Sequence, residues 1–439
     1  MRRKSLNAAL LATAMLTVAG CSGGGAPSTE TATAPSDADK VSGTVTMLTH
    51  RTDLVQDGTM KKYAAEFNKI YPKVKVKFEG ITDYEGEIKI RMNTENYGDV
   101  LSIPAVIAKG DYPKFFAPLG ETRTMERKYR FTGKTDVGGK TYGIANFGTA
   151  NGLVYNKALW KKAGITDWPT TPAQFLVDLA KVKDKTGATP YYTNFKDGWP
   201  LTSPWTNSIG SASCDAKASD ELATADKPWA EGSDLNVIDT LLHDIVHDKL
   251  SEKDPTTTNW ESSKAQLAKG EIGSMMLGSW AINQMRDAAE KAGENPDDIG
   301  FMPFPVQKAG QFCATLLSDY QLAINAHSKS KGAARAWLDW FTEKSGFAAK
   351  EGGVSALKAN KLPDVLKPYL DNDVKLVERS EAKTEDVNTI DNASEIGLAK
   401  PDYRQKLIDM ARGARDGDLR SYFDDLNKRW ADAAAAAGS

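Results

Sequence analysis

Aromatic side chains that stand in polar loops are the residues of this sequence whose types and spacing point most clearly to chemistry. Residues 191–205 read YYTNFKDGWPLTSPW, which combines five aromatic residues with Gly, Pro, Asn, Asp and Ser. We interpret this segment as a loop and not as a core strand. An indole covers the apolar face of a sugar ring, while polar side chains and backbone groups bind its hydroxyls. Trp199 and Trp205 therefore predict a carbohydrate platform, although two large aromatics can also serve only to pin a long loop to the protein body.

A further tryptophan stands where a predicted strand meets a predicted helix. Ser279 is the expected N-cap of that helix, and Trp280 lies in its first turn. In parallel α/β sheets, ligands bind where strands end and helices begin, so Trp280 is expected to stack on a ligand. The same argument makes His50 and Arg51 candidate binding residues, because they follow the first predicted strand.

A histidine pair is the other candidate for chemistry. His243 and His247 lie four residues apart, the spacing that zinc hydrolases use on one helical face. Asp244 stands where that motif needs a glutamate, and no third ligand is evident, so we interpret the pair as a solvated helix face and expect no metal site. The sequence has no phosphate-binding loop, nucleophile elbow or dinucleotide fingerprint, and no cofactor is expected.

The acidic residues leave one enzymatic alternative open. Glycosidases use two carboxylates, and only the separation of these groups in space is diagnostic. With 58 acidic residues, the chain allows many such pairs. The alternative function is therefore a secreted carbohydrate-active enzyme, either a lyase or a hydrolase.

Strands and helices alternate along the chain. The segment KVKVKF at 73–78 alternates with period two, as a strand does, and residues 60–71 place apolar side chains on one helical face. Such alternation predicts an α/β fold with mixed, mostly parallel sheets. We expect strands at 44–50, 73–78, 100–103, 153–155, 272–277 and 322–324, and helices at 60–71, 84–92, 157–163, 172–182, 262–268, 281–291 and 334–341.

The N-terminal residues have the form of a bacterial lipoprotein signal. Basic residues at 2–4 precede an apolar stretch at 6–18, and VAGC at 18–21 ends in Cys21, which would carry lipid after removal of residues 1–20 as a signal peptide. The apolar stretch is shorter than the roughly 20 residues that span a membrane. Residues 21–40, rich in Gly, Ser, Thr, Ala and Pro, predict a flexible tether. We therefore expect an extracytoplasmic protein that is anchored to the cell membrane by lipid.

Charge and cysteine content narrow the function classes. The chain has 56 Lys and Arg against 58 Asp and Glu, a formal net charge of −2, so it lacks the basic excess of a nucleic-acid-binding protein. If Cys21 carries lipid, Cys214 and Cys313 are the remaining pair in an oxidising compartment, and we predict a disulfide between them. Two buried thiols are the alternative.

In their order along the chain, these features resemble the extracellular solute-binding proteins of carbohydrate ABC importers, the family that includes maltose-binding protein. The resemblance covers residues 41–431, and each piece of it is weak alone. Its carriers are the lipobox at Cys21, the strand-helix-strand opening, YGI at 142–144, GLVYNKALW at 152–160, GSW at 278–280, FMPFP at 301–305, AINAHSK at 323–329 and WLDWF at 337–341.

The resemblance implies a two-lobed, class II periplasmic-binding-protein-like fold with three crossovers between the lobes. By position, the crossovers are expected near 146–152, 304–307 and 352–357. Lobe 1 would then comprise 41–147 and 306–353, and lobe 2 would comprise 148–305 and 354–439. A bond between Cys214 and Cys313 would lie beside the hinge, or it would restrict closure.

The resemblance also implies a function without chemistry, in which an oligosaccharide is captured in the cleft and delivered to the permease subunits of an ABC importer. The implied partners are this oligosaccharide, the permease and the membrane reached through the lipid, with no nucleic acid, and the protein would act as a monomer. The ligand-binding residues expected from the family position and from the loops are His50, Arg51, Asp83, Tyr84, Asn146, Phe147, Trp199, Trp205, Trp280, Asp319 and Tyr320.

Overall fold

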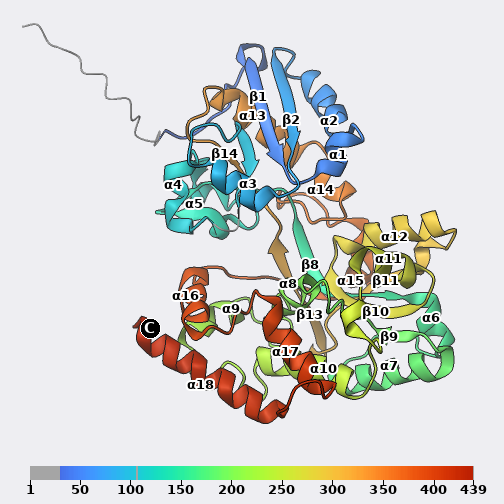
Figure 1. The fold of residues 1–439 in the computed structure, drawn as a ribbon. Coiled ribbons are helices and arrows are strands. Elements are labelled where there is room, and N and C mark those ends of the chain that lie inside the picture. The colour runs from blue at the N-terminus through green and yellow to red at the C-terminus, as the bar shows by residue number, and fades with distance from the viewer. Residues whose placement is uncertain (1–29, 105–106, 439) are drawn as a thin grey trace, which may run out of the picture.

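Strand pairing divides the chain into two α/β lobes, which lie one above the other in Figure 1. A computed structural model describes residues 30–104 and 107–438. Within these residues, a five-stranded sheet and a small three-stranded sheet organise lobe 1, and a seven-stranded sheet organises lobe 2. The expected two-lobed α/β fold is thereby confirmed.

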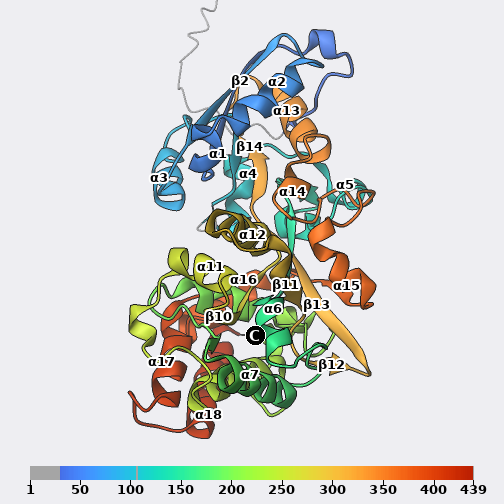
Figure 2. The same ribbon diagram turned by 90° about the vertical axis from the view of Figure 1, so that its right-hand side faces the viewer.

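Lobe 1 is built around strand β1 (Gly43–Thr49), which is parallel to β2 and β3. Helix α13 packs against β1 and α2 (Figure 2) and buries Trp337, whose ring lies 5.2 Å from that of Phe67 and 5.7 Å from that of Phe78. Burial of these large apolar rings holds the helices on the sheet. The other elements of lobe 1 are β2 (Val74–Gly80), β3 (Val100–Ser102), β4 (Gly120–Glu121), β5 (Asp136–Val137), β6 (Lys140–Thr141), β7 (Ile144–Ala145), β14 (Gln321–Ile324), α1 (Thr52–Gln56), α2 (Thr59–Asn68), α3 (Tyr84–Arg91), α4 (Tyr112–Phe115), α5 (Thr122–Met125), α13 (Lys331–Glu343) and α14 (Phe347–Lys350).

Lobe 2 is built around strand β8 (Gly148–Asn156). Leu153 and Val154 point to opposite faces of this strand and join different hydrophobic clusters, so β8 is apolar on both faces. The other elements are β9 (Thr189–Tyr191), β10 (Ile272–Gly278), β11 (Ile299–Met302), β12 (Gln307–Lys308), β13 (Gln311–Ser318), β15 (Lys375–Glu378), α6 (Lys157–Lys162), α7 (Pro172–Thr186), α8 (Ser203–Thr206), α9 (Ala218–Glu221), α10 (Asp234–His247), α11 (Trp260–Ala268), α12 (Ala281–Ala292), α15 (Lys367–Asp371), α16 (Thr384–Ser394), α17 (Pro401–Ala411) and α18 (Leu419–Ala437).

The sheets are mixed, as predicted, but antiparallel pairing prevails around β8. This strand is antiparallel to β10, β11 and β13, while β10 is parallel to β9 and β13 is parallel to β15. The chain enters lobe 2 along β8 and leaves it along β13, and neighbouring strands that carry the chain in and out must run in opposite directions. The expectation of mostly parallel pairing is therefore wrong for lobe 2.

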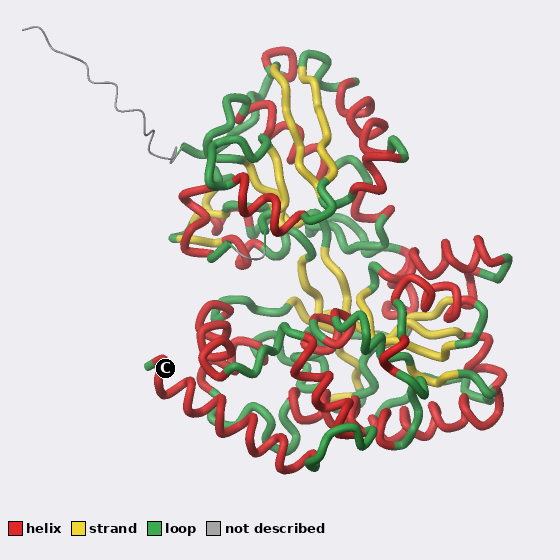
Figure 3. The backbone as a smooth tube through the Cα atoms, viewed as in Figure 1, coloured by secondary structure: helices red, strands yellow, loops and turns green. Residues whose placement is uncertain are grey.

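Three segments carry the chain between the lobes, where Figure 3 shows two strands, β8 and β13, reaching up to lobe 1. The first passage joins β7 to β8, the second joins β13 to β14 at 319–320, and the third follows α14. The sequence placed the second passage at 304–307, which is wrong, because β12 and β13 form a hairpin of the lobe 2 sheet. Ala309 and Gly310 close this hairpin with φ of 50° and 80°. Residues 306–318 therefore belong to lobe 2.

The start of the described chain packs on lobe 1. Ala32 is buried, its N–H donates to Pro118 O at 2.8 Å, and its carbonyl accepts from Arg335 Nη1 at 2.7 Å. The expected flexible tether covers 21–40, and these main-chain bonds attach the chain to lobe 1 at Ala32, within that range. The predicted signal peptide at 1–20 and Cys21 lie outside the described residues. Among the residues described, no helix has the length and apolar character to cross a membrane.

Cys214 and Cys313 are joined by a disulfide, with their Cα atoms 5.4 Å apart and a sequence separation of 99. Both ends lie in lobe 2, because Cys214 lies between α8 and α9, and Cys313 is in β13 of the lobe 2 sheet. The bond therefore does not link the lobes, and it leaves their relative movement free.

Replacing both cysteines with alanine should lower the free energy of unfolding by about 2–5 kcal/mol, because a loop of this length loses its constraint in the unfolded chain. Ligand affinity should stay within about twofold of wild type at the same time, since the bond lies in one lobe. Chemical denaturation and calorimetric titration of the Cys214→Ala, Cys313→Ala protein measure the two effects. An unchanged unfolding midpoint, or a large loss of affinity, would contradict this account.

Candidate functional site

The segments that pass between the lobes are hydrogen-bonded to one another. Asp319 N donates to Phe147 O at 3.0 Å, and Gly148 and Val354 exchange two backbone hydrogen bonds of 2.6 and 2.7 Å. The side-chain amide of Asn146 donates to Asp319 Oδ2 at 3.3 Å. These bonds make a ribbon of three adjacent strands, which we call the hinge ribbon. It joins the lobes and forms the floor of the space between them.

Glycine allows the strands of the hinge ribbon to approach closely. A Cβ atom added at Gly148 would lie 2.4 Å from Phe131 Cζ, and one added at Gly353 would lie 2.5 Å from Phe147 Cδ2. Such separations are far inside van der Waals contact, so a larger residue at either position would push the neighbouring ring aside.

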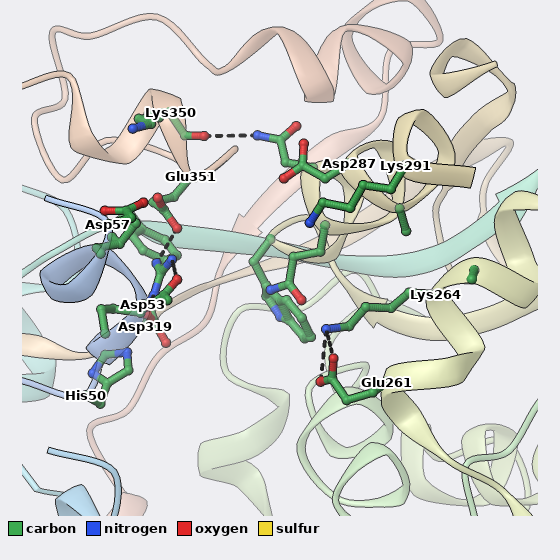
Figure 4. A pocket seen from close by; sticks show the side chains of 18 of the residues that line it. His50, Asp53, Asp57, Glu261, Lys264, Asp287, Lys291, Asp319, Lys350 and Glu351 are labelled. Atoms are coloured by element: carbon green, nitrogen blue, oxygen red, sulfur yellow. Dashed lines mark hydrogen bonds and ion pairs between the residues drawn. The ribbon is translucent and has the colours of Figure 1, made fainter. Parts of the chain in front are cut away.

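A cavity of about 1220 Å³ opens between the lobes, with Phe147 and Asp319 among the residues of its wall. Lobe 1 contributes the junction of β1 with α1 and the end of α14, and lobe 2 contributes α11 and α12 (Figure 4). We call it the charged cavity, because charged side chains dominate its lining. They are Arg51, Asp53, Asp57, Glu261, Lys264, Lys269, Asp287, Lys291, Asp319, Lys350 and Glu351.

Arg51 is committed to carboxylates on its own lobe. Its Nη2 lies 2.7 Å from Asp53 Oδ2, and its Nη1 pairs with Glu351 Oε2. Burial by itself would lower the pKa of Arg51, but these two carboxylates raise it above the ordinary value. For Asp53 burial acts in the opposite direction and raises the pKa. The hydrogen bonds from Arg51 more than offset burial, so the pKa of Asp53 lies below its ordinary value. Arg51 is therefore a fixed cation, with much of its donor capacity already used by the protein.

His50 lines the charged cavity against two tyrosines. Its ring centroid lies 4.4 Å from that of Tyr320 and 5.9 Å from that of Tyr84. The Tyr84 hydroxyl is tied to the backbone of Ser102, to whose carbonyl it donates at 2.9 Å. Burial lowers the pKa of His50, although Asp319 opposes the effect, so the imidazole is neutral at pH 7.

A second cavity, of about 540 Å³, adjoins the first, and Trp280 and Asp319 line both. We call it the aromatic cavity. Aromatic rings stand here beside neutral hydrogen-bonding groups, the combination that an uncharged, hydroxyl-rich ring requires. Its hydrogen-bonding and aromatic lining consists of Tyr112, Thr149, Asn151, Trp199, Ser203, Asn207, Trp280, Ser318, Tyr320 and Gln321, with Lys134, Asp319, Arg379 and Glu381 as charged members. Although smaller, it is the better candidate for a ligand site.

Three indoles gather on the lobe 2 side of this cavity. The ring centroids of Trp199 and Trp260 are 5.0 Å apart, and Trp280 lies 5.9 Å from each of them. The three come from different elements, because Trp260 begins α11, Trp280 precedes α12 and Trp199 lies ahead of α8. Their mutual packing holds Trp199 and Trp280 in place before any ligand arrives, which reduces the ordering cost of binding.

Ser279 fixes Trp280 in a way that the sequence did not predict. Trp280 itself occupies the N-cap position of α12, and no side chain caps the helix. Ser279 Oγ instead accepts from Ala150 N at 3.2 Å and lies 3.2 Å from Thr149 Oγ1. The expected N-cap role of Ser279 is therefore wrong, and its hydroxyl ties the start of α12 to β8.

The structure brings most of the predicted ligand-binding residues to the two cavities. Those on the walls are His50, Arg51, Phe147, Trp199, Trp280, Asp319 and Tyr320.

The other four predicted ligand-binding residues do not line either cavity. Trp205 is only 1% exposed, because residues 191–205 begin inside strand β9 and return into the core of lobe 2, where Trp205 packs on Tyr191. Asp83 is exposed, and its carboxylate accepts from Gly86 N to cap α3. Tyr84 and Asn146 are buried behind the walls and support His50 and Asp319. The interpretation of 191–205 as a loop throughout is also wrong, because this segment begins in strand β9 and ends in helix α8.

His243 and His247 lie on α10, away from both cavities. Their rings stack with centroids 5.5 Å apart, and each Nδ1 contacts the carboxylate of the following aspartate. Over the part of the chain that the structure describes, no three His, Cys, Asp or Glu side chains are grouped so that they could hold a metal ion.

Sequence reasoning missed several residues of the site. Trp260 follows Asn259, which caps α11 by accepting from Ser262 N at 2.8 Å, so its place at a helix start was visible in the sequence. Arg379 and Glu381 follow β15 and reach the aromatic cavity from a segment that carries no motif.

Glu252 anchors the segment that leads to Trp199. Its carboxylate accepts from Thr193 N at 2.9 Å and from the Thr193 hydroxyl. Burial raises the pKa of Glu252 to about 7, although the hydrogen bonds from Thr193 lower it in part.

Comparison with known proteins places this two-lobed architecture in a family. A family model described as bacterial extracellular solute-binding protein matches residues 52–346, about two thirds of the chain. The chain belongs to this family.

Relatives of this solute-binding protein are known in complex with sugars. A binding protein of an ABC transporter from Bifidobacterium animalis subsp. lactis, solved in complex with mannobiose, is 33% identical, with 91% of this chain and 96% of the other covered and a TM-score of 0.81. A manno-oligosaccharide specific solute-binding protein from the same organism, in complex with mannotriose, is 30% identical at the same coverage, with a TM-score of 0.82. The multiple sugar-binding protein of Streptococcus mutans is 24% identical over 297 residues, which are 65% of this chain and 68% of the other.

The raised pKa of Glu252 predicts a pH-dependent stability. Between its ordinary pKa of 4.5 and about 7, the unfolded chain releases this proton while the folded protein keeps it, so the free energy of unfolding falls as pH rises through this window. Glu252→Gln removes this pH-dependent contribution to the free energy of unfolding. The melting temperature of Glu252→Gln minus that of wild type should therefore be higher at pH 8 than at pH 5. Thermal unfolding of both proteins at both pH values measures this difference. Glu290→Gln, an exposed change on α12, is the control, and an equal shift at both pH values for Glu252→Gln would refute the assignment.

Proposed function

We propose that this solute-binding protein captures an oligosaccharide between its lobes and delivers it, chemically unchanged, to the permease of an ABC importer. The observation that carries the proposal is the aromatic cavity, where Trp199 and Trp280 stand beside amide and hydroxyl groups that both lobes contribute. Indole faces supply contact with the apolar face of a sugar, and the neutral groups supply hydrogen bonds to its rim. Family membership and the sugar-bound relatives support the same function.

Capture follows from the hinge ribbon. Tyr320 and Gln321 reach the aromatic cavity from lobe 1, whereas Trp280 and Asn151 reach it from lobe 2. A ligand that contacts both walls stabilises the conformation in which the walls are close, so binding shifts the population of lobe arrangements toward closure. The permease would recognise the closed pair of lobes, and no bond in the sugar is made or broken.

Manno-oligosaccharides are the first ligands to test. The two solved relatives at 33% and 30% identity contain mannobiose and mannotriose, and each alignment covers 91% of this chain. The neutral part of the aromatic cavity suits such an uncharged ligand, because desolvating a charged one would need a paired countercharge.

Trp280→Ala should weaken mannotriose binding by about 30-fold or more, since truncation of a central aromatic contact costs about 2 kcal/mol or more. Isothermal titration of both proteins measures the effect. Trp168→Ala is the matched control, because that indole packs on Phe312 and Tyr369 in lobe 2 and lines neither cavity. The control should lose stability and keep its affinity.

Two outcomes would overturn the proposal. Equal affinities for wild type and Trp280→Ala would remove the aromatic cavity as the binding site. The appearance of new reducing ends during incubation with oligosaccharides would show turnover, which is incompatible with capture and release of an unchanged sugar. A thermal-shift panel of other di- to tetrasaccharides extends the search, because a ligand at 100 times its dissociation constant adds about 2.7 kcal/mol of stability.

We also propose that the mature protein is held at the outer face of the cell membrane by lipid on Cys21. The basic start, the apolar stretch and the VAGC sequence at 18–21 support this anchor. Cys21→Ser should move the protein from the membrane fraction to the medium in the native host, as fractionation and immunoblotting would show. Retention of the variant in the membrane fraction would contradict lipid anchoring through this residue.

A further inference from the structure

A third cavity, of about 220 Å³, continues from the aromatic cavity within lobe 2. Ser203, Asn207 and Arg379 line both cavities, so the two spaces meet at these side chains. On its far side the third cavity reaches α16, where Thr384 and Asn388 are exposed to solvent. We call it the side groove, because it leads from the aromatic cavity to the outside between α8, α9 and α16. Its polar lining also includes Thr206, Ser219, Asp220, Ser380 and Asp391.

The carboxylates of the side groove are hydrogen-bonded within the protein, and so are the hydroxyls of Thr206, Ser380 and Thr384, whereas three other neutral side chains are free in the part of the chain that the structure describes. Asp220 accepts from Lys383 N at 3.0 Å and from the Ser380 hydroxyl, and Asp391 accepts from the backbone N–H groups of 397 and 398. The side chains of Ser203, Ser219 and Asn388 make no hydrogen bond within the described chain. Free hydroxyl and amide groups beside hydrogen-bonded carboxylates suit the hydroxyls of a sugar.

Arg379 stands at the junction of the groove with the aromatic cavity. Its backbone N–H donates to Leu316 O at 3.1 Å, which continues the pairing of β15 with β13 and fixes its position. Its Nη1 donates to Asn207 Oδ1 at 3.2 Å, and its Nη2 lies 3.6 Å from Glu381 Oε1. Its Nε is buried without a partner in the described chain. The guanidinium therefore forms part of the wall of both spaces while still carrying unused donor capacity.

The side groove lies in one lobe. Its residues fall within 203–222 and 379–399, all in lobe 2, so movement of the lobes about the hinge ribbon does not reshape it. Its volume is below the roughly 300–1,000 Å³ of a complete small-molecule site, so it suits an extension of a ligand held elsewhere. We propose that the side groove binds further hexose units of a manno-oligosaccharide that is longer than the aromatic cavity can hold. This inference rests on the proposed function and adds selectivity for chain length.

Isothermal titration with linear manno-oligosaccharides of two to six units tests the side groove. Affinity of the wild type should rise with chain length, because each further unit adds hydrogen bonds in the groove. Asn388→Trp fills the groove from its exposed rim and should remove this rise, with a loss of about tenfold for mannohexaose and less than about twofold for mannobiose. Hydrogen exchange of residues 384–394 should slow with mannohexaose and stay unchanged with mannobiose.

Asn392→Trp is the matched control, since Asn392 is an exposed asparagine of the same helix that does not line the groove, and it should behave as wild type. Equal effects of the two substitutions, or a wild-type affinity that does not depend on chain length, would overturn the inference while mannobiose binding still upholds the proposed function. A wild type that binds none of these sugars would overturn the inference together with the manno-oligosaccharide assignment.

Discussion

Backbone pairing at the hinge ribbon is the constraint on which the rest of this structure depends. The passages around Phe147, Asp319 and Val354 are hydrogen-bonded side by side, so the lobes are connected by one narrow piece of sheet. Movement of one lobe against the other must bend this sheet at its narrowest point, and the site lies directly on it. Gly148 and Gly353 permit the tight packing against phenylalanine rings that makes the ribbon compact.

The cleft separates two kinds of chemistry on either side of Trp280 and Asp319. The charged cavity is lined mainly by cations and carboxylates, of which Arg51 pairs with Asp53 and Glu351, and Lys264 pairs with Glu261. The aromatic cavity offers indole faces and neutral hydrogen-bonding groups, whose desolvation costs less than that of unpaired charges. The larger cavity is therefore the less suitable site for an uncharged ligand. The residue types that line the two cavities, and not their volumes, identify the better site.

Local rules predicted the elements well, because each depends on residues close in sequence. Helix α7 begins as expected, with Thr171 Oγ1 accepting from Gln174 N at 3.1 Å, and strand β10 runs into Trp280 at the edge of the cleft. The hairpin of β12 and β13 was missed, because its turn at Ala309 and Gly310 has no strong turn signal in the sequence. The crossover between the lobes was expected directly after FMPFP at 301–305 instead. That one error moved the second passage and made the disulfide look as if it bordered the hinge.

The sequence by itself determined the α/β lobes, the position of Trp280 between a strand and a helix, and the cysteine pair. Each of these follows from periodicity, capping or composition within a short window or from the absence of other partners. Tertiary structure alone decided which indoles face a ligand, since Trp199 reaches the cleft while Trp205, six residues later, is buried. It also decided that Trp260 joins Trp199 and Trp280, and that Arg379 borders the same cavity. The physical reason is that burial and cavity walls are set by side chains from distant segments, whose meeting depends on the packing of the whole lobe and leaves no trace in the neighbouring residues.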